Sequence, residues 1–132
     1  MRAIDRIIIH HSASPRATTT LEQIAGWHRE RGFDEIGYHL VIQEAGVVRA
    51  GRAFDVVGAH ARGFNTSSVG VCVVGNNTIP EEVWSHEQIV ALRAVVGTLL
   101  AVFPDAMVCG HRDVGRTECP GLDVRALFPS SG

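Results

Sequence analysis

The chain has 132 residues, a length that suits one domain built around one hydrophobic core. Hydrophobic residues make up 45% of the chain and charged residues 20%, as in an ordinary globular domain. The formal net charge of −2 argues against nucleic-acid binding and against a strongly cationic surface that adheres to the cell wall or to membranes. We therefore expect a single domain over residues 1–132, a monomer without a nucleic-acid or membrane partner.

The cysteine count and the first residues indicate where the protein is made. Three cysteines are an odd number, so a closed disulfide framework is not expected. The apolar run Ile7-Ile8-Ile9 is too short for a signal-peptide core, and no small-residue cleavage site follows it. No segment approaches transmembrane length. We expect a protein made in the cytoplasm without a signal peptide, with reduced thiols available for a metal.

Short apolar runs alternate with segments of helical periodicity along the chain. Threonines precede the first helix, and Ser85 with Gln88 resembles a capping box at the start of the longest one. Because the elements alternate unevenly and include a hairpin, they predict an α/β fold with a mixed parallel and antiparallel sheet packed by helices. The predicted elements are strands at 4–11, 36–42, 47–50, 69–75 and 106–109, and helices at 21–31, 85–103 and 123–128.

Polar rings occur at the ends of three predicted strands. His10 and His11 end the first strand, and because side chains alternate along a strand, at most one of them is expected to reach a given metal. Tyr38 opens the second strand, and His111 follows the last one. One sheet could bring such residues to one rim, although hydrogen-bonded histidines and a core-edge tyrosine are the simpler interpretation of each residue alone.

The segment 110–121 combines a histidine, a cysteine, charged residues, glycines and a proline without apolar periodicity, which is typical of a functional loop. His111 and Cys119 are both good zinc ligands, and a catalytic zinc site takes three protein ligands and one open position. A structural zinc site would need a fourth ligand, and no pair of cysteines has C-x-x-C spacing. From the residues alone, a zinc hydrolase and a site without metal both stay open, and no substrate is named.

Five segments recur together, in this order, in one known family: residues 9–14 (IHHSAS), 37–42 (GYHLVI), 58–65 (GAHARGFN), 69–75 (VGVCVVG), and 110–113 (GHRD) with Cys119-Pro120. The combination resembles the zinc-dependent N-acetylmuramoyl-L-alanine amidases. That family includes the amidase-type lysozymes (endolysins) of tailed bacteriophages and the animal peptidoglycan recognition proteins. The resemblance covers nearly the whole chain, and it implies the amidase fold and cleavage of the amide between N-acetylmuramic acid and L-alanine in peptidoglycan.

The resemblance also implies roles for individual residues. The three Zn²⁺ ligands of the family fall on His10, His111 and Cys119, and its catalytic tyrosine falls on Tyr38. Implied contacts with the substrate fall on His60, with Asn65 nearby. To these we add Arg116, a positive charge close to the cysteine ligand that could help at the site.

One position departs from the phage members, which carry a catalytic lysine two residues before the cysteine ligand. Here that position is Thr117, as in the recognition-protein amidases. Threonine can donate a hydrogen bond but brings no positive charge, so catalysis would depend more on zinc and Tyr38.

Two alternatives to a phage-type endolysin stay open. Recognition relatives that only bind peptidoglycan have usually lost the cysteine ligand, and Cys119 is present here, which favours an enzyme over a binding module. A cytoplasmic amidase that recycles soluble muropeptides would share the chemistry. An endolysin would instead act on the host cell wall, in the periplasm.

Overall fold

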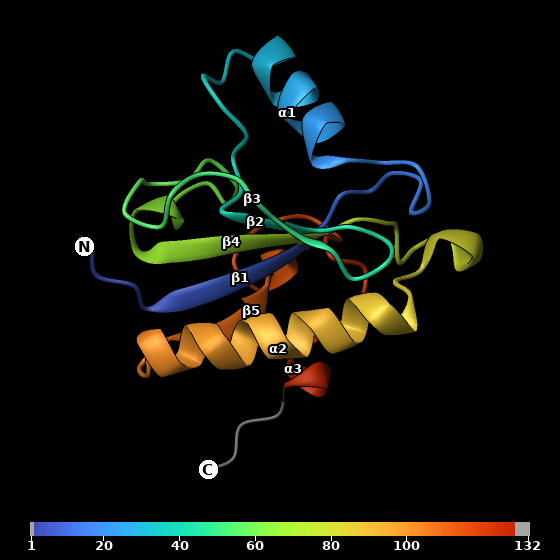
Figure 1. The fold of residues 1–132 in the computed structure, drawn as a ribbon. Coiled ribbons are helices and arrows are strands. Elements are labelled where there is room, and N and C mark those ends of the chain that lie inside the picture. Colours follow the sequence, from blue (N-terminus) through green and yellow to red (C-terminus); the bar gives the residue numbers. More distant parts are fainter. Residues whose placement is uncertain (1, 129–132) are drawn as a thin grey trace.

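The computed structural model describes residues 2–128, and its centre is a five-stranded sheet in the order β3-β2-β4-β1-β5 (Figure 1). β1 pairs in parallel with both β4 and β5, β2 is parallel to β4, and β3 is antiparallel to β2. The predicted mixed sheet is therefore confirmed. The strands are β1 (Arg6–His11), β2 (Leu40–Ile42), β3 (Val48–Ala50), β4 (Ser68–Val73) and β5 (Met107–Gly110).

Helices cover both faces of the sheet. Figure 1 shows α1 on one side of the strands and α2 with α3 on the other. Alternating residues of the two central strands, such as Ile9 and Val71, pack on the α2 side, whereas Cys72 packs with α1. The helices are α1 (Leu21–Glu30), α2 (His86–Val102) and α3 (Val124–Leu127), with short 3₁₀ turns η1 (Asn65–Ser67), η2 (Pro80–Glu82) and η3 (His111–Asp113).

Both long helices begin with the capping signals found in the sequence. Thr20 and Gln23 form a capping box at the start of α1, and Ser85 and Gln88 form one at the start of α2. The buried Gln88 amide also donates hydrogen bonds to the carbonyl oxygens of Ile42 (3.2 Å) and Val74 (2.7 Å). The cap therefore fixes the start of α2 against the carboxyl ends of two strands.

The second strand is shorter than predicted, because β2 begins at Leu40 rather than at residue 36. The preceding backbone makes hydrogen bonds that are not those of a ladder. The Gly37 N–H donates to Nδ1 of His28 at 2.8 Å, and the Tyr38 carbonyl accepts from the Arg52 N–H at 2.9 Å. Tyr38 therefore lies in an irregular segment before the strand and not at the carboxyl rim of the sheet.

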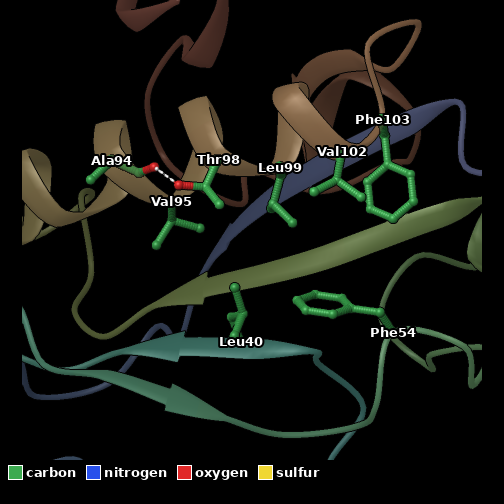
Figure 2. A pocket seen from close by; sticks show the side chains of 8 residues that line it. All are labelled: Leu40, Phe54, Ala94, Val95, Thr98, Leu99, Val102 and Phe103. Carbon is green, nitrogen blue, oxygen red and sulfur yellow. Dashed lines mark hydrogen bonds between the residues drawn. The ribbon is translucent and has the colours of Figure 1, made fainter.

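An apolar groove of about 400 Å³ lies between α2 and the edge of the sheet (Figure 2). Leu40 and Phe54 form one wall, and residues of α2 and its end form the other. The only polar side chain lining it, Thr98, bonds back to the Ala94 carbonyl at 3.0 Å. The groove therefore offers no group for acid–base or metal chemistry.

Within residues 2–128, none of the helices has the length and apolar character needed to span a bilayer.

Candidate metal centre and active site

Two histidines are brought together by the pairing of β1 with β5. These strands are parallel neighbours, with Ile9 opposite Gly110, so the next residues, His10 and His111, emerge side by side. Their ring centroids lie 4.7 Å apart. His10 lies in register with Cys72, on the α1 side of the sheet, whereas Ile9 before it packs on the α2 side. His10, and not His11, therefore faces His111.

Cys119 completes a cluster with these two histidines. It lies in the irregular loop after η3, and its Sγ is 3.8 Å from Nδ1 of His10. One ligand atom from each of His10, His111 and Cys119 lies within 4.8 Å of the others. Cys72 and Cys109 are both buried in strands and take no part in this cluster.

The cluster fits a zinc ion in its chemistry and spacing. Two imidazoles and one thiolate form a ligand set typical of Zn²⁺, and bonds of about 2.0–2.3 Å place tetrahedral ligand atoms about 3.5 Å apart. Burial and the neighbouring histidines keep the pKa of His10 well below its ordinary value, so its ring is neutral and able to bind a metal. Burial raises the pKa of the Cys119 thiol to about 11 without metal, so zinc uptake would displace its proton.

His60 orients the His10 ring from the side away from Cys119. Nε2 of His10 lies 2.8 Å from Nδ1 of His60, and Nε2 of His60 lies 3.2 Å from Oγ of Ser68. With Nδ1 of His10 directed at the metal position, its Nε2–H donates to His60, which in turn donates to Ser68. Burial holds the pKa of His60 down at about 3, so this ring is neutral as well.

Tyr38 reaches the same cluster from the segment before β2. Its ring centroid is 5.0 Å from that of His10 and 5.4 Å from that of His28. Burial, together with the thiols of Cys72 and Cys119, raises the pKa of the phenol well above its ordinary value. The hydroxyl therefore keeps its proton at neutral pH and is available as a hydrogen-bond donor.

The cluster lies in a groove of about 420 Å³ that holds both apolar and charged groups. Arg31 and Arg62 bring positive charge to the groove, and its lining contains no carboxylate. The Arg31 guanidinium carbon lies over the Phe33 ring, 5.2 Å from its centroid. The full lining is His10, His28, Arg31, Phe33, Tyr38, Ala59, His60, Ala61, Arg62, Gly63, Asn65, His111 and Cys119.

Of the other predicted site residues, Asn65 lies in the groove lining, whereas Arg116 and Thr117 do not. The Oδ1 atom of Asn65 accepts hydrogen bonds from the backbone N–H groups of His60 and Ala61, both at 2.9 Å. This oxygen therefore stabilises the loop at 60–65. Thr117 and Arg116 are exposed and lie outside the groove lining. The Thr117 hydroxyl accepts the N–H of Cys119 at 3.2 Å, which places it beside the cysteine.

Sequence reasoning missed the arginines of the groove and the bond between His60 and His10. The sequence did contain one signal for the close packing of His60, namely Gly70 within the buried run of β4. A Cβ atom at this position would lie 2.6 Å from the His60 ring. A glycine inside a strand often marks such a close approach. Nothing in the spacing of Arg31 or Arg62 indicates the groove.

Comparison with known proteins agrees with this geometry. Residues 1–122 match the protein family described as N-acetylmuramoyl-L-alanine amidase. The endolysin of Klebsiella phage KP32 is 38% identical over 125 residues, which cover 91% of this chain and 82% of the phage protein.

Solved structures of amidases and peptidoglycan recognition proteins also match this chain. The amidase LysC from Clostridium intestinale matches with a TM-score of 0.87 at 30% identity, covering 96% of this chain and 83% of that one. A mutant of the Drosophila recognition protein PGRP-LB, in complex with tracheal cytotoxin, matches with a TM-score of 0.86 at 27% identity, covering 98% and 83%. The chain therefore belongs to the N-acetylmuramoyl-L-alanine amidase family and is an enzyme of that class, similar to phage endolysins.

Proposed function

We propose that this amidase is a zinc-dependent endolysin of the phage type. It hydrolyses the amide between N-acetylmuramic acid and L-alanine in bacterial peptidoglycan. The observation that carries the proposal is the convergence of His10, His111 and Cys119 in a groove that also holds Tyr38. Zn²⁺ held by these three residues would supply a Lewis acid that polarises the scissile carbonyl and lowers the pKa of a water to about 7.

Tyr38 has the properties of an oxyanion donor. Its raised pKa keeps the hydroxyl protonated, and its ring lies beside the His10 ring in the lining of the groove. A donor fixed by packing loses little entropy when charge develops on the carbonyl oxygen. We assign Tyr38 the role of stabilising that charge. Thr117, whose oxygen is occupied by the N–H of Cys119, still has a hydroxyl proton to donate, and we assign it a second bond of this kind.

The groove walls are proposed to bind the sugar and the peptide stem. His60 and Asn65 line the groove, and because Oδ1 of Asn65 serves the loop, contact with substrate goes through its amide NH₂ group. Arg31 and Arg62 give the groove a positive charge that favours a substrate with carboxylates. Arg116, exposed beside Thr117, is proposed to contact the outer part of the substrate.

The comparisons support a lytic enzyme that acts on the cell wall. The relatives from phages are endolysins, and the structural relative PGRP-LB was solved with tracheal cytotoxin bound. We propose a monomer as the active form. We propose that residues 1–132 form one catalytic domain.

Metal analysis and digestion of peptidoglycan test the proposal together. The purified protein should hold about one zinc per chain, and chelation should abolish activity until zinc is restored. Mass spectrometry of digested sacculi should show free L-alanine amino termini on the stem peptides and intact glycan strands. Full activity after rigorous zinc removal would contradict the zinc site. Cleavage of soluble muropeptides without release of material from intact sacculi would instead indicate a recycling amidase.

A further inference from the structure

Cys119 is held differently from the other two proposed ligands, because it does not lie on a strand or helix. Its carbonyl accepts the Arg112 N–H at 2.7 Å, and the Gly121 N–H bonds to the Glu118 carbonyl at 2.6 Å. Both bonds are internal to the segment 110–121. They shape the loop, but they do not fix the sulfur relative to β1, where His10 lies.

The link to β1 runs through the backbone of His11. Its N–H donates to Sγ of Cys119 at 3.3 Å, so the residue after one proposed ligand holds the sulfur of another. His11 is 7% exposed, and Nδ1 of its ring accepts the backbone N–H of Asn77 at 3.2 Å. The His11 side chain is therefore fixed by the turn that follows β4.

Asn77 is hydrogen-bonded both to His11, whose N–H contacts the sulfur, and to Pro120, which follows Cys119 in the chain. Its backbone N–H holds the His11 ring, and its side-chain Nδ2 donates to the carbonyl of Pro120 at 2.8 Å. Its Oδ1 accepts the backbone N–H of Trp84 at 3.1 Å, which fixes the orientation of the amide. Within residues 2–128, Asn77 is the only side chain outside the segment 110–121 that hydrogen-bonds to the backbone of residues 117–121.

The loop also packs closely around Asn77. Gly121 has a φ of 79°, and a Cβ atom added there would lie 3.0 Å from Cβ of Asn77. The glycine therefore allows the chain after Cys119 to approach the turn at 76–78. This close approach places the Pro120 carbonyl within reach of the amide.

We propose that Asn77 is a positioning residue that holds the Cys119 sulfur at the distance from His10 that zinc binding requires. It does so from the turn after β4, by tying His11 and Pro120 to the same residue. The inference rests on the proposed zinc site and extends it to a residue that touches neither metal nor substrate. Partners of this kind typically change metal affinity about 10–100-fold when they are lost.

The substitution Asn77→Asp tests one bond. It preserves the backbone N–H that reaches His11 and an oxygen that accepts from Trp84, but it removes the donor to Pro120. The matched control is Asn76→Asp, which adds the same charge one residue earlier. Oδ1 of Asn76 only accepts bonds from the Thr78 N–H and hydroxyl, and an aspartate would retain both.

Zinc affinity is measured by competition with a chromophoric chelator, and Co²⁺ is used as a spectroscopic probe of the thiolate. We expect Asn77→Asp to bind zinc about 10-fold or more weakly and to show a weakened or shifted sulfur-to-cobalt charge-transfer band. Asn76→Asp should match the wild type in both measurements. If Asn77→Asp does not fold, Asn77→Ser, which also removes the amide, is measured in its place with the same expectation.

Zinc affinity and a cobalt spectrum like those of the wild type in the Asn77 variant would overturn the inference. A lower melting temperature of the metal-free variant with an unchanged cobalt spectrum would also overturn it, because that result indicates a structural role alone. If the wild-type protein itself binds neither metal, the proposed function fails and this inference fails with it. Metal bound by the wild type and equally well by Asn77→Asp refutes only the role of Asn77.

Discussion

The sheet and the loop that follows it hold the proposed metal ligands by different means. His10 and His111 emerge from neighbouring parallel strands, and the register of β1 and β5 fixes their spacing. Cys119 lies on a loop whose position depends on individual hydrogen bonds, among them those of His11 and Asn77. We therefore expect the strand-borne part to tolerate changes in distant side chains, and the loop-borne part to depend on a few contacts.

The difference indicates where the site is vulnerable. A ladder of backbone hydrogen bonds is shared among many residues, so the backbone positions of His10 and of Gly110, the residue before His111, do not depend on any one side chain. A single side-chain bond to a loop backbone has no such redundancy. Substitutions on the sheet should therefore act through packing at the site itself, and substitutions near the loop should act through the position of the sulfur.

The largest effect is expected for His10→Ala, which removes a strand-borne ligand. The two remaining ligands hold zinc weakly, so zinc content and amidase activity should both be lost. Zinc analysis of the purified variant measures this directly. The control is His86→Ala, an exposed histidine at the start of α2, which should keep about one zinc per chain. Retention of zinc by His10→Ala would show that the ion binds elsewhere.

Tyr38→Phe should separate catalysis from metal binding. The substitution removes the hydroxyl and keeps the ring that packs against His10, so fold and zinc content should be unchanged. Loss of one oriented bond to a developing oxyanion typically lowers kcat about 10²–10³-fold. Steady-state cleavage of a soluble muropeptide gives the value. Wild-type kcat in this variant would make Tyr38 a packing residue.

Gly70→Ala should disturb the strand-borne part through packing. The new methyl group would lie 2.6 Å from the His60 ring, and such overpacking typically costs about 1–3 kcal/mol of the free energy of unfolding. Zinc affinity should fall as well, because the His60 ring is hydrogen-bonded to His10. Urea unfolding of the metal-free protein and chelator competition give the two values.

Gly97→Ala is the matched control for this change. Gly97 lies in the middle of α2, and among residues 2–128 no atom other than those of its chain neighbours and its own helix backbone lies within 4 Å of where its Cβ would be. Alanine there should therefore raise stability by about 1 kcal/mol through helix propensity. Equal stability changes of the same sign in the two variants would contradict the close approach at Gly70.

The smallest effect is expected for the two cysteines in strands. Cys72 is 0% exposed and Cys109 is 1% exposed, so in the folded protein neither should react with iodoacetamide. Cys119 is half-buried and should react slowly in metal-free protein and not at all with zinc bound. Mass spectrometry of peptides after timed alkylation distinguishes the three. Zinc protection of Cys109 in place of Cys119 would overturn the assignment of the sulfur ligand.

Much of the fold could be predicted from patterns that act over short distances. The β-branched run before His11 predicted β1, and the capping residues Thr20 and Ser85 marked the starts of both long helices. Strand alternation also predicted that His10 and His11 point to opposite faces of the sheet, and only His10 lies in the cluster with His111 and Cys119. These patterns succeed because their physical cause lies within a few residues.

Other features depend on contacts that no local pattern contains. The strand predicted from residue 36 was too long, because backbone groups of the segment before Leu40 form hydrogen bonds with His28 and Arg52 outside the strand ladder. The role of Asn77 was equally hidden, since its partners His11 and Pro120 are distant in sequence. The rim expected at the strand ends was also only partly right, because Tyr38 reaches the cluster from before β2.

The placement of the ligands along the chain has a consequence for synthesis. His10 lies in the first strand, whereas His111 and Cys119 follow the last strand. A chain that emerges from the ribosome with its N-terminus first therefore holds one ligand of three until β5 has joined β1. Such a chain lacks the complete metal site, so the proposed hydrolysis can begin only after the sheet is finished. Zinc at the proposed site would then stabilise the completed chain, by about 2.7 kcal/mol when its free concentration is 100 times the Kd.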